Sequence, residues 1–343
     1  MNNNIVKVGL SCPQDAIAVV PHLLGFHPSP GSLALIAFSA SQNTGVLRYD
    51  IPPASQAAAL NGHLIRCLAS QRADEVIIIG YGPAAQVTPA LTSTREALDG
   101  LLTIREILRV TNGRWWSLMC ENPACCPPEG TPCDTASTVP AAQFTVHGSA
   151  PLPSRADLAA TLSPVTGPEA TRMRAVIRRH ARRLLPRIAR AQSPAAFLPR
   201  VAALTALPVP LSDDDTAELL VLLGIIRLRD EAWALTESRD PDEQIAFWTD
   251  VTRRAPGRHA AAPACLLAYA AACMTGDSTR AGIAVENALR ADPSYSMALL
   301  LDDMLWSGRP PQQFRLPLTT AGLAAHDVPG NSDEPGNSQA PRP

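Results

Sequence analysis

The sequence contains few charged residues, few aromatic residues and almost no lysine. Charged residues make up 17% of its 343 residues, aromatic residues make up 4%, and Lys7 is the only lysine among 29 basic residues. The formal charge of −2 gives no overall attraction to nucleic acid or to a membrane surface. No run of about 18 apolar residues occurs, and the polar N-terminal residues do not resemble a signal peptide. We therefore expect a cytoplasmic protein with reduced thiols and no membrane contact.

Several catalytic and nucleotide-binding motifs are also missing. The patterns G-x-S-x-G and H-E-x-x-H do not occur, and GYGP at 80–83 lacks the glycine spacing and the lysine of a phosphate loop. Hydrophobic residues nevertheless reach 46%, which is enough to form a sizeable core. The sequence thus predicts a folded protein and leaves open whether it is an enzyme.

The first third of the chain alternates β-rich runs with helical patterns. Asn112-Gly113 is a strong signal for a tight hairpin between two of these runs. The alternation predicts an α/β domain with a mixed, partly parallel sheet over residues 1–165. The β-rich runs are 5–10, 32–39, 46–51, 76–80, 104–110 and 114–119, and the helical patterns cover 11–24, 55–70 and 89–101.

The rest of the chain shows helical patterns and no convincing strand. We expect a helical region over 166–316 and, because Pro, Gly, Asn and Ser dominate there, a disordered tail over 317–343. Ala281, Val285, Ala288 and Pro293 have the spacing of the second helix of a tetratricopeptide repeat. The helical region is therefore predicted to end in a tetratricopeptide-like helix hairpin.

Arginine and acidic residues are segregated along the helical region. Residues 170–212 contain nine arginines and no acidic residue, whereas 213–243 contain ten acidic residues. An arginine-rich helix over Arg172–Arg190 can neutralise phosphates, but no aromatic residues are interleaved for base stacking. We expect these arginines to pair with the acidic segment inside the protein, and we do not expect nucleic-acid binding.

Residues 120–133 form a loop rich in cysteine and proline. Four of the eight cysteines lie here, and four prolines exclude both a helix and a central strand. Cys120, Cys125, Cys126 and Cys133 could bind zinc, but no C-x-x-C spacing occurs and two of them are adjacent. We expect the first three thiols to act mainly as small apolar or weakly hydrogen-bonding groups. The alternatives are zinc binding and redox or nucleophilic chemistry, and no cofactor other than zinc is expected.

The loop and its surroundings resemble a known family. RWWSLMCENPACCPPEGTP, VIIIGYGP and the N-terminal VVPHLLGFHPSPGSLALIAF are similar to the family called domain of unknown function 4192, which is common in high-GC bacteria. GDSTRAGIAVENALRADPSYSMALLL near the C-terminus resembles it as well. The resemblance implies a soluble bacterial protein and no particular activity.

A ligand site is predicted at one edge of the sheet. If the runs starting at Val46, Val76 and Ile104 point in the same direction, Asp50, Tyr81 and Arg109 lie at their carboxyl ends, where α/β sheets bind ligands. Arg114 follows just past the hairpin. Glu129 in the cysteine loop is a further candidate, as a general base, a metal ligand or an acceptor of backbone hydrogen bonds.

The adjacent Trp115 and Trp116 must point to opposite faces of their strand. We expect one to be buried in the core and the other to cover the cysteine loop or a domain interface.

Two functions remain from the sequence. The first is a non-catalytic protein-interaction or scaffold module that binds a partner protein through its C-terminal helices. The second is a protein or enzyme that binds a small molecule or nucleotide at one sheet edge. The lack of a complete catalytic motif favours the first.

Overall fold

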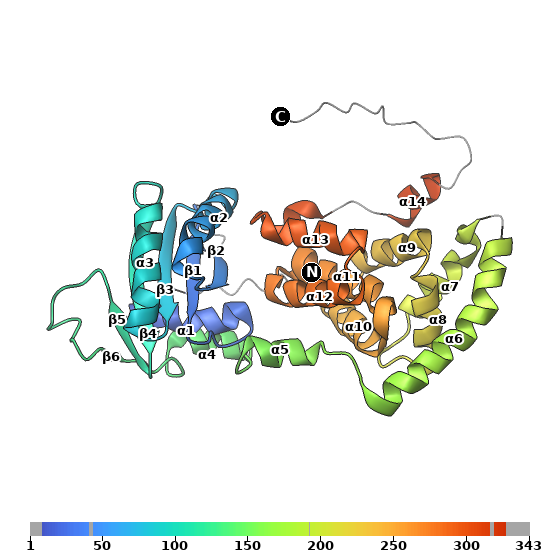
Figure 1. Cartoon of the computed structure of the whole chain (residues 1–343), viewed down its shortest axis with the longest axis horizontal. Coiled ribbons are helices and arrows are strands. Elements are labelled where there is room, and N and C mark those ends of the chain that lie inside the picture. The colour runs from blue at the N-terminus through green and yellow to red at the C-terminus, as the bar shows by residue number, and fades with distance from the viewer. Residues whose placement is uncertain (1–8, 41–43, 192, 316–318, 327–343) are drawn as a thin grey trace, which may run out of the picture. The chain divides into compact units, whose positions relative to one another are not determined.

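The computed structural model describes residues 9–40, 44–191, 193–315 and 319–326 (Figure 1). The chain divides into two compact units. The first, here called the α/β unit, comprises Met1–Ser163, Asp277–Gly282 and Asp302–Gln313. The second, the helical unit, comprises Pro164–Gly276, Ile283–Leu301 and Phe314–Pro343. No helix of the described residues is both long enough and apolar enough to cross a membrane.

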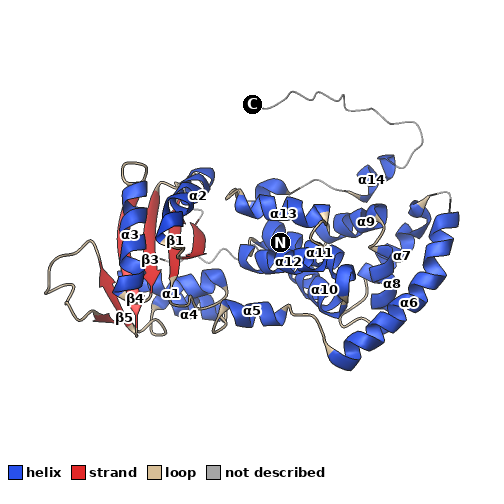
Figure 2. Ribbon diagram, viewed as in Figure 1, coloured by secondary structure: helices blue, strands red, loops and turns tan. Residues whose placement is uncertain are grey.

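The α/β unit is built on one mixed sheet (Figure 2). Its six strands run in the order β2-β1-β3-β4-β5-β6, and only β3 and β4 pair in parallel. This confirms the predicted mixed, partly parallel sheet. Asn112 and Gly113 both have positive φ, as the tight turn between β4 and β5 requires. The strands are β1 (Ser32–Phe38), β2 (Thr44–Asp50), β3 (Glu75–Tyr81), β4 (Thr103–Thr111), β5 (Arg114–Ser117) and β6 (Thr131–Pro132).

Helices pack against the sheet because its central strands are apolar on both faces. Leu33, Leu35 and Ile78 belong to a fully buried cluster with residues of α2 and α3. The alternate residues Ala34 and Ile36 are equally buried and point to the opposite face, on the side of α1. The helices of this unit are α1 (Pro13–Leu24), α2 (Ala57–Ser70), α3 (Ala84–Leu98), α4 (Val139–Val146) and α5 (Arg155–Thr161).

The described residues after β6 contain helices and no strand, as predicted. Ser212 accepts a hydrogen bond from the Asp215 amide at the start of α8, and Pro241 begins α10. The helices are α6 (Gly167–Arg190), α7 (Leu198–Thr205), α8 (Asp213–Leu222), α9 (Ile226–Glu237), α10 (Pro241–Arg254), α11 (Ala261–Tyr269), α12 (Ser278–Ala291), α13 (Ser296–Trp306) and α14 (Thr320–His326). Residues of α12 and α13 contribute to both units.

The structure bears on three further predictions, for the N-terminal strand, the helix hairpin at Gly276 and the C-terminal tail. The strand expected at 5–10 lies mostly outside the described residues, and residues 9 and 10 are not in a strand. The helix hairpin at Gly276 exists, but a π-helical segment, Ala270–Thr275, precedes it, and its tetratricopeptide-like character is not confirmed. The segment expected to be a disordered tail, 317–343, includes the short helix α14. Thr319 caps the first turn of this helix, since its hydroxyl accepts a hydrogen bond from the Gly322 amide. Residues 327–343 lie outside the described part of the chain.

The arginine-rich helix α6 pairs with the acidic start of α8. Arg172 donates to Asp213 at 2.7 Å, Arg179 donates to Asp214, and Arg183 lies 3.8 Å from Glu218. Arg200 holds Glu218 through two hydrogen bonds of 3.1 and 2.9 Å. The predicted internal pairing is confirmed for these arginines.

We expect the helical unit to lose stability in mild acid. Hydrogen bonds from Arg172, His180 and Arg200 lower the pKa of Asp213, Asp214 and Glu218, respectively. Carboxylates with a lowered pKa in the folded state stabilise the protein above their unfolded-state pKa, and this stabilisation is lost as the pH falls through the folded-state pKa. The urea midpoint should therefore fall between about pH 5 and pH 3. Glu218→Gln should weaken this pH dependence, and an unchanged profile in that variant would contradict the assignment.

Candidate functional site

The cysteine loop leaves the sheet after β5 and returns at β6, and it projects from the sheet edge (Figure 1). Its second half, residues 127–130, is a turn closed by a 2.8 Å hydrogen bond from the Gly130 amide to the Pro127 carbonyl. Trp116 Nε1 donates to the Pro128 carbonyl at 2.9 Å, and Arg114 donates to the Gly130 carbonyl at 2.6 Å. Gly130 has positive φ, and a Cβ there would overlap the Trp116 ring. Trp116 and Arg114 thus fix the turn to the sheet.

The first half of the loop brings three thiols together. The Ser117 hydroxyl accepts from the Cys120 amide at 3.1 Å, and the Asn122 carbonyl accepts from the amides of Cys125 and Cys126 at 3.0 and 2.7 Å. This tight turn places the Sγ atoms of Cys120, Cys125 and Cys126 within 4.8 Å of one another. Cys125 is exposed and the other two are half-buried, so the group is open to solvent.

The pKa values of the Cys120 and Cys126 thiols are shifted in opposite directions. The backbone of Asn122 hydrogen-bonds to Cys120, and the thiols of Cys126 and Cys125 add to this effect, which lowers the pKa of Cys120. Desolvation and the neighbouring thiols raise the pKa of Cys126 to about 12. Of these two thiols, Cys120 therefore ionises more readily than Cys126.

Cys133 and Glu129, two other candidates from the sequence, do not join this group. The Cys133 amide donates to the Gly113 carbonyl at 2.8 Å, which places this residue beside the β4–β5 hairpin. Burial raises the pKa of its thiol. Glu129 is exposed. Its backbone carbonyl, not its carboxylate, lies 3.5 Å from a guanidinium nitrogen of Arg114. The four-cysteine arrangement is thus reduced to three thiols.

The predicted sheet-edge site is divided between the two faces of the sheet. β2, β3 and β4 do point in the same direction, so Asp50, Tyr81 and Arg109 lie at the same edge. Ser32 pairs with both Asp50 and Tyr81, and paired residues share a face. Arg109 pairs with Gly80, the neighbour of Tyr81, and so points to the other face.

Each of these three side chains has its own surroundings. Asp50 accepts from Arg48 at 2.6 Å, which is the ion pair expected for two residues on one strand. The guanidinium of Arg109 stacks on Trp116, 3.6 Å from the ring centroid. Tyr81 is buried, and its hydroxyl has no hydrogen-bond partner in the described part of the chain. The three do not converge on one ligand position.

The comparison with protein families agrees with the resemblance seen in the sequence. A family model described as Domain of unknown function (DUF4192) matches residues 13–312. The chain belongs to this family. The match includes the cysteine loop, the whole described sheet and most of the helical unit. No curated protein and no solved structure matches the chain.

A polar cluster that the sequence did not predict also lies within the residues that match the family. His63 Nε2 lies 3.0 Å from the Tyr49 hydroxyl and 3.4 Å from Cys67 Sγ. The spacing of four residues between His63 and Cys67 on one helix is the signal that could have shown it. Burial raises the pKa of Cys67 and lowers that of His63, so a neutral thiol and a neutral imidazole are favoured. The cluster is a hydrogen-bonded part of the core and lacks an activated nucleophile.

Proposed function

We propose that this protein is a non-catalytic binding module whose cysteine loop holds a zinc ion through Cys120, Cys125 and Cys126. The ordered loop is then presented to a protein partner. The observation that carries the proposal is the convergence of three Sγ atoms within 4.8 Å on a loop outside the hydrophobic core. Three thiols close together on a solvent-accessible turn are the chemistry that a soft or borderline metal ion selects.

The spacing of the sulfur atoms suits zinc. Zn–S bonds of about 2.3 Å in a tetrahedral site place the sulfur atoms about 3.8 Å apart. The thiols, within 4.8 Å of one another, need only a small movement to reach that separation. Three protein ligands leave the fourth position to water or to a ligand atom of the partner.

Local hydrogen bonds to Ser117 and the Asn122 carbonyl shape the first half of the loop, which projects away from the core. Arg114 and Trp116 hold the turn at 127–130, so the thiols are not needed to fold that turn onto the sheet. Residues 121–125 are exposed and have no regular secondary structure. A metal ion would add a cross-link to these hydrogen bonds, because its binding free energy contributes directly to the order of the segment that it joins.

The C-terminal helices offer a second contact surface for a protein partner. Leu299 and Leu300 on α13 are 46% and 69% exposed, although both are large apolar residues. Exposed apolar side chains on neighbouring positions of a helix are typical of surfaces that bind other proteins. This supports the assignment of the helical unit to partner binding.

Full-length protein purified under reducing conditions without chelator should contain about one zinc ion per chain by elemental analysis. Replacement of zinc by cobalt should give the thiolate-to-metal charge-transfer bands and strong visible absorption of a tetrahedral sulfur site. Cys120→Ser, Cys125→Ser and Cys126→Ser should each abolish stoichiometric binding, because two thiolates are fewer than the three protein ligands that hold zinc when the fourth position is open. A host protein that binds through the loop should be retained by the zinc-loaded chain and lost in Cys126→Ser.

Cys133→Ser is the matched control, since it removes a thiol of the same segment that lies outside the group of three. It should bind zinc as the unmodified chain does. A chain that stays free of metal when titrated with zinc, or equal loss of zinc in Cys133→Ser and Cys126→Ser, would overturn the proposal.

A further inference from the structure

The outer face of α6 carries three arginines that no other part of the described chain engages, here called the arginine row. α6 lies on the outside of the helical unit, with α8 on its inner side (Figure 1). Arg174, Arg178 and Arg182 are exposed, and none of them makes an ion pair or a hydrogen bond with a described residue. They are four residues apart, so their guanidinium groups lie on one face at steps of about 6 Å along the helix.

Another side of the same helix shows what this spacing of arginines binds. Arg179 donates to Asp214, and Arg183 lies 3.8 Å from Glu218. These two arginines are four residues apart on α6, and the two carboxylates are four residues apart on α8, so the helices match turn by turn. The arginine row has the same spacing and therefore fits a second helix whose carboxylates are four residues apart.

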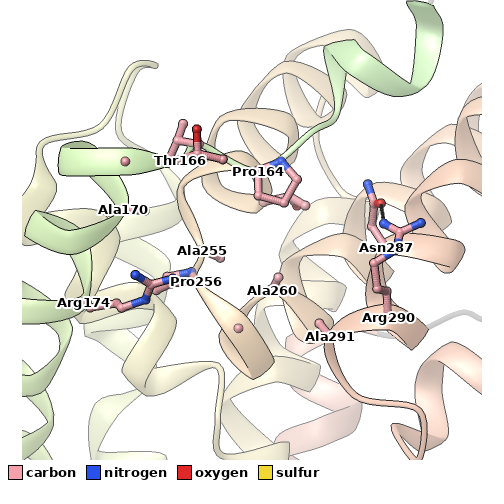
Figure 3. Close-up of a pocket in the computed structure, with 14 residues that line it drawn as sticks. Pro164, Thr166, Ala170, Arg174, Ala255, Pro256, Ala260, Asn287, Arg290 and Ala291 are labelled. Carbon is pink, nitrogen blue, oxygen red and sulfur yellow. Dashed lines mark hydrogen bonds between the residues drawn. The ribbon is translucent and has the colours of Figure 1, made fainter. Parts of the chain in front are cut away.

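Apolar surface adjoins both ends of the arginine row. Leu185 follows Arg182 by three residues, which makes it a neighbour on the helix surface, and it is 46% exposed. At the other end, Arg174 is a wall residue of a pocket of about 360 Å³ whose walls also include Ala260 and Ala291 (Figure 3). A ligand recognised by charge alone would leave this apolar surface uncovered, whereas an amphipathic helix would cover it.

We propose that the arginine row, Leu185 and the pocket together bind an amphipathic helix of a partner protein, with acidic residues at every fourth position. The carboxylates pair with the three arginines, and apolar side chains at the two ends of the partner helix pack on Leu185 and in the pocket. From Arg174 to Leu185 the surface is about 16 Å long, so the partner helix needs about three turns. This surface is separate from the cysteine loop and does not depend on a metal ion.

Nucleic acid and a lipid surface fit this face less well. α6 contains no Phe, Tyr or Trp that could stack on bases. Met173, Ile177 and Leu184 are buried in the helical unit, so they cannot enter a membrane. Leu185 alone offers too little apolar area for the insertion of an interfacial helix. An acidic helix uses both the charges and Leu185.

Calorimetric titration of the full chain with two synthetic alanine-based helices of identical composition tests the proposal. The first peptide has three glutamates four residues apart and a leucine at each end of the same face, and the second has the glutamates spread around the helix. The first should bind saturably and more tightly. Arg178→Gln and Arg182→Gln should each weaken its binding about two- to fivefold, the effect of one exposed ion pair. Leu185→Ser should weaken binding without changing its salt dependence, because Leu185 carries no charge.

Arg190→Gln is the matched control, because Arg190 is an exposed arginine of the same helix that lies about 120° around the axis from Arg178. It should bind the first peptide like the unmodified chain. Equal binding of the two peptides, or equal weakening in Arg190→Gln and Arg178→Gln, would show nonspecific attraction to the arginine-rich helix and overturn the proposal. So would the absence of saturable binding, tighter binding of a DNA duplex or of phosphatidylserine vesicles than of the first peptide, or self-association of the chain that Arg178→Gln abolishes.

Discussion

Replacement of Trp115 by alanine should destabilise the α/β unit by about 3–5 kcal/mol, the usual cost of removing a large buried aromatic side chain. Trp115 is 9% exposed and lies in the same row of the sheet as Val110 and Tyr81. Its Nε1 has no hydrogen-bond partner among the described residues, so Trp115→Phe should cost much less than Trp115→Ala. Urea denaturation, detected by hydrogen exchange of the strand amides, measures the loss of stability in Trp115→Ala and in Trp115→Phe.

Trp116 provides the comparison, because it points to the other face of the same strand. Its ring contacts Arg109 and the turn at Gly130, as expected for the tryptophan that covers the cysteine loop. Trp116→Ala should have a smaller effect on global stability and should make the loop thiols react faster with a disulfide reagent. Equal, small stability losses in the two alanine variants would contradict this division of roles.

Trp248→Ala should be the most damaging single substitution in the helical unit, again by about 3–5 kcal/mol. Trp248 is fully buried, its Nε1 donates to Thr236 Oγ1 at 2.9 Å, and its ring meets Phe247 edge-on at 4.9 Å. Truncation leaves a large cavity that the surrounding helices fill only partly. Equilibrium unfolding, with hydrogen exchange reporting on α9 and α10, measures the loss.

A double-mutant cycle with Trp248→Phe and Thr236→Val separates the hydrogen bond from the packing. The coupling energy should be about 0.5–1.5 kcal/mol, the net contribution of a neutral hydrogen bond. A total loss in Trp248→Ala no larger than that coupling would show that the ring is not part of the rigid core.

The fold was largely predictable because its signals are local. Asn112-Gly113 specifies a hairpin turn, Ser212 caps α8 and Pro241 starts α10, and each depends only on neighbouring residues. The prediction for α3 is wrong at its start. The sequence predicts a helix that begins at Pro89, whereas α3 begins at Ala84 and includes Pro89 in its interior.

The candidate sites were predictable only in part because they depend on geometry. The spacing of Cys120, Cys125 and Cys126 matches no standard zinc motif, and their convergence follows from a turn around the Asn122 carbonyl. The strand directions were predicted correctly, but the pleat sends Tyr81 and Arg109 to opposite faces. The arginines of α6 could not be told apart from the sequence, since only the tertiary structure shows that Arg172, Arg179 and Arg183 lie beside acidic residues of α8.

The two-residue strand β6 determines how the cysteine loop behaves over time. β6 is the outermost strand of the sheet and pairs only with β5, so few backbone hydrogen bonds close the loop. Its opening therefore requires far less free energy than unfolding of the sheet, and the loop amides should exchange with solvent by local fluctuation. The thiol group is also open to solvent, so a metal ion bound there would exchange while the central strands stay folded, at a rate independent of the rate of global unfolding.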